Sequence, residues 1–173
     1  VWMGEILFRT KLSENLFKGL SPWMQKLPGG LIHVNVVGCA LFAAISGSSA
    51  ATVANVGKMS IPELRKRNYP EKILLGSLAG SGTLGLLIPP SIILIIYGVA
   101  VQESIAKLFI AGIIPGIMIA LIFMSYVIIW SLINKSEMPK IVEEYSFFEK
   151  IKRSKQLLPV ILLILSVIGS IYT

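Results

Sequence analysis

The sequence predicts an all-α integral membrane protein, a multi-span helical bundle that contains a re-entrant hairpin and a discontinuous helix. Apolar residues make up 54% of the 173 positions and charged residues only 14%, against roughly 25% in soluble domains. All charges fall outside residues 27–57, 73–102, 108–134 and 156–173, and three of these stretches exceed the roughly 20 residues that a spanning helix needs. Glycine, serine and threonine interrupt two of the stretches near their middle.

The composition also excludes several kinds of active site. Sixteen Lys and Arg against nine Glu give a formal net charge of +7, and the chain contains no Asp. The single histidine and single cysteine, His33 and Cys39, cannot supply a zinc cluster or an internal disulfide. A Ser-His-Asp triad is impossible within the chain, and the uncharged stretches hold no acid and base pair. We therefore expect no catalytic residue and no enzyme activity.

Residues 1–27 are expected to form the end of a preceding span and then an amphipathic helix at the membrane interface. Apolar residues recur there at spacings of three and four, and the lysines lie off that stripe. The stripe consists of Leu12, Leu16, Leu20, Trp23, Met24 and Leu27. The same pattern fits a helix packed on a neighbouring subunit equally well. Since the chain begins without Met and ends in an apolar run, we expect it to be an internal fragment.

Residues 28–57 are expected to form the re-entrant hairpin, with its tip at 46–49. Four small residues, Ser46, Gly47, Ser48 and Ser49, stand in the middle of this uncharged stretch. They free backbone groups that lipid cannot satisfy, so such a segment must face protein or a water-filled cavity. Two short helical arms joined at the tip fit this requirement better than one straight span.

The basic segments set the expected topology. Residues 58–72 carry five Lys and Arg and are predicted to be a cytoplasmic loop, whereas 103–107 is nearly neutral and is placed outside. Residues 135–155 carry six and return to the cytoplasm. The run at 65–67 lacks the interleaved aromatic residues of a nucleic-acid site, so no nucleic acid partner is expected.

Residues 73–102 are predicted to be a discontinuous transmembrane helix. Gly80, Gly82 and Gly85 allow the backbone to open, and Pro89 and Pro90 remove N–H groups that a continuous helix would use. The three glycines also match a dinucleotide-binding pattern, but no strand precedes them and the prolines would break the helix that must follow. No organic cofactor is therefore expected. Two interrupted segments in one membrane protein indicate the binding site of a transporter.

The remaining segments are simpler. Residues 108–134 are predicted to be a transmembrane helix, and 156–173 the start of a further one. Between them, 135–155 is expected to form a cytoplasmic or interfacial arm helix that begins at Pro139. Its apolar face would consist of Ile141, Tyr145, Phe148 and Ile151.

Four blocks of this sequence resemble the large membrane subunit of the TRAP (tripartite ATP-independent periplasmic) transporters. They are GGLIHVNVV at 29–37, ISGSSA at 45–50, GTLGLLIPPSIILIIYG at 82–98 and LFIAGIIPG at 108–116. Their spacing matches as well, and the likeness covers essentially the whole chain. The blocks around the two interruptions are most similar to the sialic-acid branch. Family members are more than twice as long, so the resemblance implies an internal piece of the N-terminal half.

The resemblance implies an elevator-type secondary transporter in the bacterial inner membrane that couples inward sodium flow to uptake of an organic acid anion. Sialic acid is the expected substrate, and a C4-dicarboxylate or another carboxylate is the alternative. The expected partners are a periplasmic substrate-binding protein and a small membrane subunit of the Q type.

Both interruptions are expected to contribute to the transport site. Sodium prefers oxygen ligands, and because no carboxylate lies near either break, hydroxyl groups and backbone carbonyls would have to supply them. Helix N-termini that start after each break would favour an anionic substrate. The expected sodium ligands are Ser46, Gly47, Ser48, Ser49, Ser81, Thr83 and Gly85. The expected substrate-binding residues are Ser48, Ser49, Gly82, Thr83, Pro89, Pro90 and Ser91.

A different function remains open on the residues alone. Selectivity filters of channels also use backbone carbonyls of Gly and Thr segments, so an ion channel or pore subunit is the main rival. Such a filter needs a ring of repeated loops, and the chain contains no evident repeat. A purely structural membrane subunit would have no cavity to justify two interruptions at mid-depth.

Overall fold

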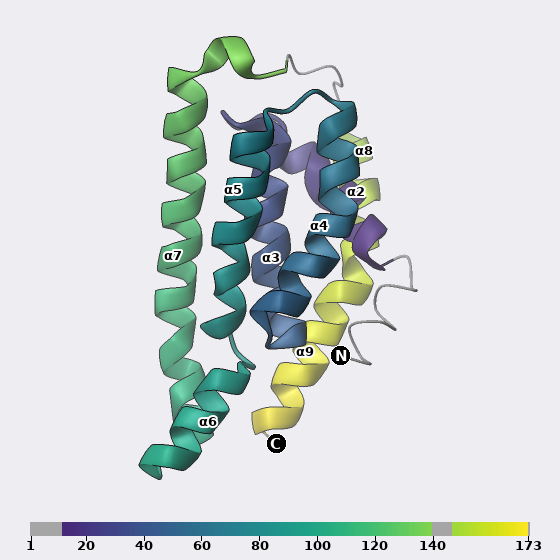
Figure 1. The fold of residues 1–173 in the computed structure, drawn as a ribbon. Helices are drawn as coiled ribbons and strands as arrows, with labels where there is room; N and C mark the ends of the chain where they lie inside the picture. Colours follow the sequence, from purple (N-terminus) through teal and green to yellow (C-terminus); the bar gives the residue numbers. More distant parts are fainter. Residues whose placement is uncertain (1–11, 140–146, 173) are drawn as a thin grey trace.

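The computed structural model describes residues 12–139 and 147–172, and these residues are helical with no strand (Figure 1). Residues 1–11, expected to end a preceding span, lie outside the described part. The α-helices are α2 (Leu12–Met24), α3 (His33–Ser46), α4 (Ser49–Lys66), α5 (Glu71–Gly82), α6 (Ile92–Val101), α7 (Ile105–Ile133), α8 (Phe147–Ser154) and α9 (Leu158–Tyr172). Short 3-10 turns occupy Gly30–Ile32, Thr83–Leu86, Lys135–Glu137 and Lys155–Leu157.

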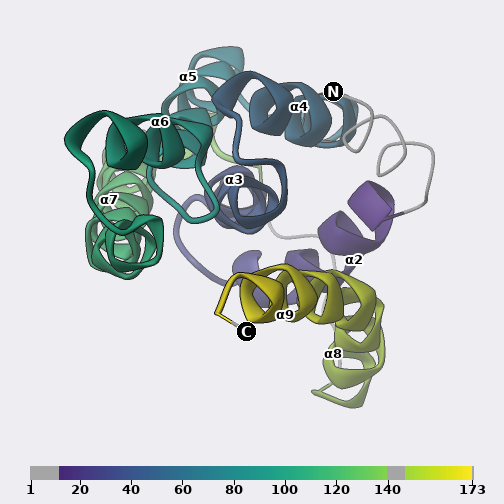
Figure 2. The same ribbon diagram turned by 90° about the horizontal axis from the view of Figure 1, so that it is seen from below.

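Helix α3 lies at the centre of the bundle, with α2, α4, α5, α7 and α9 around it (Figure 2). Its side chains are buried on nearly every side, which explains why this stretch is uncharged and shows no polar face. The core that it shares with its neighbours includes Val34, Cys39, Phe42 and Ile45. Helices α3 and α4 run antiparallel and turn at Gly47 and Ser48, so the helical hairpin predicted from the sequence is present. Its entry and exit on one side of a membrane stay a prediction.

The second arm of this hairpin is longer than predicted. The sequence was expected to form a loop over 58–72, but α4 continues through Pro62 to Lys66, and only residues 67–70 connect it to α5. The buried side chains Val56, Ser60 and Leu64 recur every fourth position, which places them on one face. The basic residues therefore occupy the exposed face of a helix rather than a loop.

The predicted interruption of 73–102 is present. Helix α5 ends at Gly82, a 3-10 turn follows, and Ser91 is extended (φ −117°, ψ 130°) before α6 begins at Ile92. The side-chain hydroxyl of Ser91 donates to the carbonyl of Leu86 at 2.6 Å, which holds the connecting segment in a compact turn.

Helix α7 matches the transmembrane helix predicted over 108–134, and it begins three residues earlier. Among the described residues it alone is both long and apolar enough to cross a bilayer, because it has 29 residues and its mean hydropathy reaches 2.5 over 18 of them. It packs along α5 and α6 and leaves most of its apolar side chains exposed. Multiple membrane crossings therefore stay a prediction, since the arms of the hairpin and the pieces of the broken helix are shorter.

Helices α2, α8 and α9 form the other flank of the bundle. Leu16 and Leu20 of the predicted stripe are buried in the core of this chain, so these two side chains do not pack on a neighbouring subunit. Trp23 at the end of α2 is half exposed, and its indole N–H donates to the hydroxyl of Ser154 on α8 at 2.8 Å. The arm helix was expected to begin at Pro139, but that residue is not helical and the described helix α8 begins at Phe147.

The rest of that arm prediction is only partly visible. Residues 140–146, and with them Ile141 and Tyr145 of the predicted face, lie outside the described part of the chain. Phe148 is 84% exposed, so it does not pack on this bundle. Helix α9 occupies the segment predicted to start a further span.

Candidate functional site: the hairpin tip and the broken helix

The hairpin turns through two residues whose conformations suit their chemistry. Gly47 adopts a left-handed conformation (φ 59°), which a residue without a Cβ takes without steric penalty, and its N–H donates to the carbonyl of Ala43. Ser48 is extended (φ −133°, ψ 125°) and caps α4, its side-chain oxygen accepting from the N–H of Ala51 at 3.5 Å. This Gly-Ser pair ends one helix and starts the next in two residues.

Two hydroxyl groups and one carbonyl meet inside the turn. The Ser46 hydroxyl lies 2.8 Å from that of Thr52 and donates to the carbonyl of Ser48 at 3.3 Å. The same carbonyl accepts the backbone N–H of Thr52 at 3.0 Å. Thr52 is fully buried and Ser46 half buried. The tip thus concentrates oxygen atoms in a part of the chain with no carboxylate.

The tip packs directly on the interruption of the broken helix. The N–H of Ile92, the first residue of α6, donates to the carbonyl of Gly47 at 3.3 Å. A Cβ on Gly47 would stand 2.5 Å from the carbonyl oxygen of Pro90, and one on Gly85 would stand 2.9 Å from the amide nitrogen of Ser49. The backbones therefore meet without intervening side chains. The two interruptions found in the sequence form one place in the structure.

A shallow groove of about 400 Å³ lies beside this contact, between the first turns of α4 and the last turn of α5. Gly82 is one of its lining residues, and any side chain at this position would collide with Val53. The lining residues are Ser49, Ala50, Val53, Ala54, Ala79, Gly82 and Thr83. The groove is open at the surface of the bundle, and most of its lining residues are small. A polar group can therefore reach the start of α4.

Helix ends supply the electrostatics of this site, because residues 27–57 and 73–102 carry no charged side chain. The C-terminus of α3 and the N-terminus of α4 meet at the tip, and the N-terminus of α6 begins beside them. Helix C-termini carry partial negative charge and N-termini partial positive charge. The described residues include no cluster of His, Cys or carboxylate ligands. The arrangement suits a hard cation at oxygen atoms and an anion at the helix N-termini.

Some of the residues predicted for the site come together at the tip and others do not. The contact just described joins Ser46, Gly47, Ser48, Ser49, Gly85 and Pro90. Three other predicted hydroxyls bond to backbone carbonyls near their own position in the sequence: Ser81 to Ser77 at 2.6 Å, Thr83 to Gly80 at 2.7 Å and Ser91 to Leu86. Ser81 is buried against α3, and Pro89 is buried on the side of α7. Ion or substrate binding by any of these residues stays a prediction.

The site residues predicted from the sequence include neither Thr52 nor Asn35. Thr52 lies four residues after the helix cap Ser48, a spacing that places both on one face of α4 and could have revealed it. The side-chain amide of Asn35 donates to the carbonyl of Leu74 at 3.2 Å and to the hydroxyl of Ser77 at 3.0 Å. Asn35 therefore ties the first hairpin arm to α5, a contact that no local pattern predicts.

Comparison with known proteins shows which family this chain is similar to. The family model described as "Tripartite ATP-independent periplasmic transporter, DctM component" matches residues 1–173. The chain is 40% identical over 146 residues to the C4-dicarboxylate TRAP transporter large permease protein DctM of Pseudomonas aeruginosa, covering 84% of this chain and 33% of that protein.

Relatives with other substrates in their names are about equally similar. The chain is 42% identical over 114 residues to the sialic acid TRAP transporter permease protein SiaT of Haemophilus influenzae, covering 66% of this chain and 18% of that protein. It is 41% identical over 115 residues to the isethionate TRAP transporter permease protein DctMQ of Oleidesulfovibrio alaskensis, again 66% and 18%. The chain thus spans a third or less of the length of these relatives.

Proposed function

The chain belongs to the DctM component family of the tripartite ATP-independent periplasmic transporters, a family of permeases and not of enzymes, and we propose that it forms part of a sodium-coupled uptake system for an organic acid anion. One observation carries this proposal: the hairpin tip and the break between α5 and α6 are in backbone contact. A coupled transporter has to bind its ion and its substrate close together. A single cluster of two interrupted helices provides that proximity.

Sodium is the proposed coupling ion, carried as cargo and bound at the tip. The hydroxyl of Ser46 lies within hydrogen-bond distance of the carbonyl of Ser48 and of the hydroxyl of Thr52, and the described tip offers neither sulfur nor imidazole ligands. A hard cation accepts such a ligand set. The C-terminus of α3 adds partial negative charge at the same point.

The substrate is proposed to bind in the groove beside Ser49 and Thr83. An anionic group there would face the first turn of α4, which carries the partial positive charge of a helix N-terminus. Sialic acid is the first candidate, and a C4-dicarboxylate or another carboxylate is the alternative, since the C4-dicarboxylate and sialic acid relatives differ by only two percentage points of identity. Uptake of one and not the other decides between them.

An elevator-type movement is proposed because the hairpin and the broken helix form one packed unit. Asn35 joins α3 to α5 near one end of this unit, and Gly47 joins the tip to Ile92 at the other. Between them, Gly57 on α4 lies close against Leu78 on α5. Helices that contact one another at both ends and along their length are expected to move as one unit. These contacts support a rigid-body movement of the hairpin and the broken helix together with the site.

We propose two protein partners and a location to complete this system. A periplasmic binding protein would deliver the substrate, in keeping with the family description. A small membrane subunit of the Q type would accompany the permease, and one relative, the isethionate permease protein, carries the name DctMQ. The proposed location is the bacterial inner membrane, crossed several times, with α7 as one of the crossings.

Reconstitution in proteoliposomes tests the proposal. Uptake of labelled sialic acid and of labelled succinate would be measured with the permease and its small subunit, in four conditions: with and without an inward sodium gradient, and with and without an added binding protein. We expect uptake of one substrate only when both are present. Uptake that persists without sodium, or single-channel currents in a planar bilayer, would overturn the coupled-carrier assignment.

A further inference from the structure

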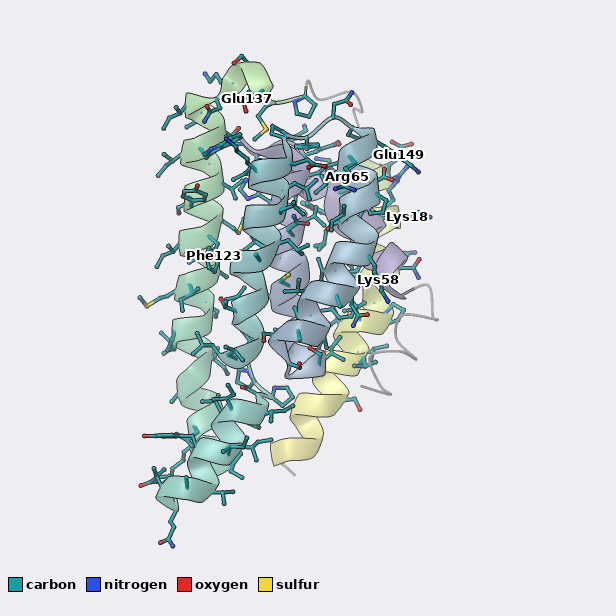
Figure 3. The ribbon with its side chains drawn as sticks, in the orientation of Figure 1. Lys18, Lys58, Arg65, Phe123, Glu137 and Glu149 are labelled. Atoms are coloured by element: carbon teal, nitrogen blue, oxygen red, sulfur yellow. The ribbon has the colours of Figure 1, made fainter. Side chains whose placement is uncertain are left out.

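A second cavity lies away from the transport site, between α5 and α7. It has a volume of about 280 Å³ and is lined by Gly76, Ser77, Ile122, Phe123, Tyr126 and Val127. Phe123 points from α7 toward α5, where its ring lies 3.1 Å from the position of a Cβ on Gly80 (labelled in Figure 3). A Cβ on Gly76 would meet no heavy atom within 4 Å. The absence of a side chain at Gly76 leaves the space open.

The walls of this cavity favour an apolar occupant. Its one lining serine, Ser77, already uses its hydroxyl, which donates to the carbonyl of Leu74 and accepts from the side-chain amide of Asn35. An apolar cavity of roughly 150 Å³ excludes water and binds small hydrocarbons, so one of this size has ample room for part of a hydrocarbon chain. Two of its lining residues on α7, the candidate span, are apolar or aromatic and exposed, Ile122 and Tyr126. If α7 crosses the membrane, lipid therefore has access to the cavity from the exposed side of α7.

Positive charge lies at the end of the cavity toward the start of α5. Lys72 precedes Gly76 by four residues, which places it on the same face of α5 and about 6 Å further along the helix axis. The turn Lys135–Glu137 follows the end of α7, and this end of α7 lies at the end of the bundle where α5 begins (Figure 1). Both Lys72 and Lys135 are exposed. The nearby acidic residues are Glu71, which pairs with Arg65 at 2.9 Å, and Glu137 in the turn after α7.

We propose that this cavity is a binding site for an anionic phospholipid. One acyl chain enters between Gly76 and Phe123, and the headgroup phosphate lies between Lys72 and Lys135. The cationic end is the one that the positive-inside rule assigns to the cytoplasm, where the leaflet is anionic and basic sites between helices bind lipid headgroups. The site is independent of the transport proposal, because none of its lining residues contributes to the hairpin tip.

Photocrosslinking in nanodiscs tests the acyl-chain part. The probe is phosphatidylglycerol with a diazirine in its acyl chain, and adducts are located by peptide mass spectrometry. Gly76→Leu fills the cavity, and Gly169→Leu on α9 is the matched control, since a Cβ there also meets nothing within 4 Å. Leucine is a better helix former than glycine, so neither change threatens folding.

We expect adducts on the peptide that contains residues 122–127 in the native protein and in Gly169→Leu, and at least a fivefold loss in Gly76→Leu. Equal labelling in Gly76→Leu would overturn the site. A complete absence of lipid adducts in the native protein would also overturn the site. This result is expected if a helix from another part of the permease fills the cavity.

The headgroup is tested by competition. Unlabelled phosphatidylglycerol should displace the probe several-fold better than phosphatidylcholine does, and the double variant Lys72→Gln, Lys135→Gln should abolish that preference while adducts at 122–127 remain. A preference that survives in the double variant would show that the two lysines do not hold the headgroup. A native protein with no preference would overturn the anionic assignment.

Discussion

At the residue scale, Ser46 is the hydroxyl on which the hairpin tip depends. It bonds to both Thr52 and the carbonyl of Ser48, so its removal leaves the buried Thr52 hydroxyl without its partner at 2.8 Å. A bound cation would lose one oxygen ligand at the same time. Thr52 lies on the inner side of the turn, and Ser46 is the half-buried member of the pair. The serine is therefore the better position at which to test the proposed ion site.

We predict that Ser46→Ala raises the sodium concentration for half-maximal uptake about fivefold, because a lost neutral hydrogen bond or ligand contact is worth on the order of 1 kcal/mol. Sodium-dependent uptake in proteoliposomes is the measurement. Ser125→Ala is the control, since that serine is exposed on α7 and its hydroxyl donates to the carbonyl of Leu121 on the same helix. Identical sodium curves for Ser46→Ala and the native protein would remove this hydroxyl from the ion site.

We predict that Gly47→Ala destabilises the protein and abolishes uptake. An alanine at φ 59° costs about 1–2 kcal/mol, and its Cβ would stand 2.5 Å from the carbonyl oxygen of Pro90, which must then move. Thermal unfolding followed by fluorescence, together with uptake, is the measurement. Gly76→Ala is the matched control, because the added methyl group there meets open space. A melting temperature for Gly47→Ala equal to that of the native protein would contradict the close contact of tip and break.

At the element scale, the broken helix exposes what local sequence can and cannot predict. Pro89 and Pro90 lack N–H groups, so the interruption is a property of the segment itself, and the structure confirms it. The contact between this interruption and the hairpin cannot be predicted from the local sequence. The hydrogen bond from Ile92 to Gly47 joins positions 45 residues apart, and only the folded bundle brings them together.

The length predicted for α4 from the sequence is wrong, because charge alone does not indicate a loop. Charges at 58–72 predicted a loop, but Ser60 and Leu64 are buried against neighbouring helices, and this packing keeps the chain helical past Pro62. Arg67 and Glu63 then pair across one turn at 3.2 Å. Charge indicates which face meets water, whereas tertiary packing decides where a helix ends.

We predict that the double variant Pro89→Ala, Pro90→Ala gains stability and loses sodium-driven uptake. With both N–H groups restored, α5 and α6 can join, and the N–H of Ile92 can bond within its own helix instead of donating to Gly47. The gain could approach roughly 3 kcal/mol for each proline. Melting temperature and uptake are measured together on inserted, folded protein.

Pro115→Ala provides the matched control for that experiment. Pro115 stands inside α7, which continues on both sides of it, and it is exposed. Its replacement should stabilise the helix and leave uptake intact. Full uptake in the Pro89 and Pro90 double variant, with a raised melting temperature, would show that the interruption has no part in transport.

At the scale of the whole molecule, the charges divide the bundle into two ends. Arg65 on α4 and Glu137 after α7 lie at one end, and α6 extends to the other (Figure 3). Helix α7 connects the ends over 29 residues, which is about 43 Å and exceeds the roughly 30 Å of a hydrocarbon core. Residues 58–72 and 135–155 together hold eleven of the sixteen Lys and Arg. The end that carries Arg65 is thus the predicted cytoplasmic end.

Cysteine labelling in spheroplasts tests this orientation, with Cys39→Ala as the background and a membrane-impermeant maleimide as the reagent. Lys66→Cys and Ser136→Cys report on the basic end, Ser104→Cys reports on the other, and all three positions are exposed. Ser60 also belongs to the basic segment, but it is fully buried and a cysteine there would be silent on either side. We expect Ser104→Cys to react in intact spheroplasts, and the other two only after permeabilisation, because α7 crosses the membrane between them.

Reaction of Lys66→Cys from outside would invert the orientation. Opposite results at Lys66 and Ser136, which lie at the same end of the bundle, would show that the ends of α4 and α7 lie on different sides of the membrane. The proposed transport unit would then be wrong.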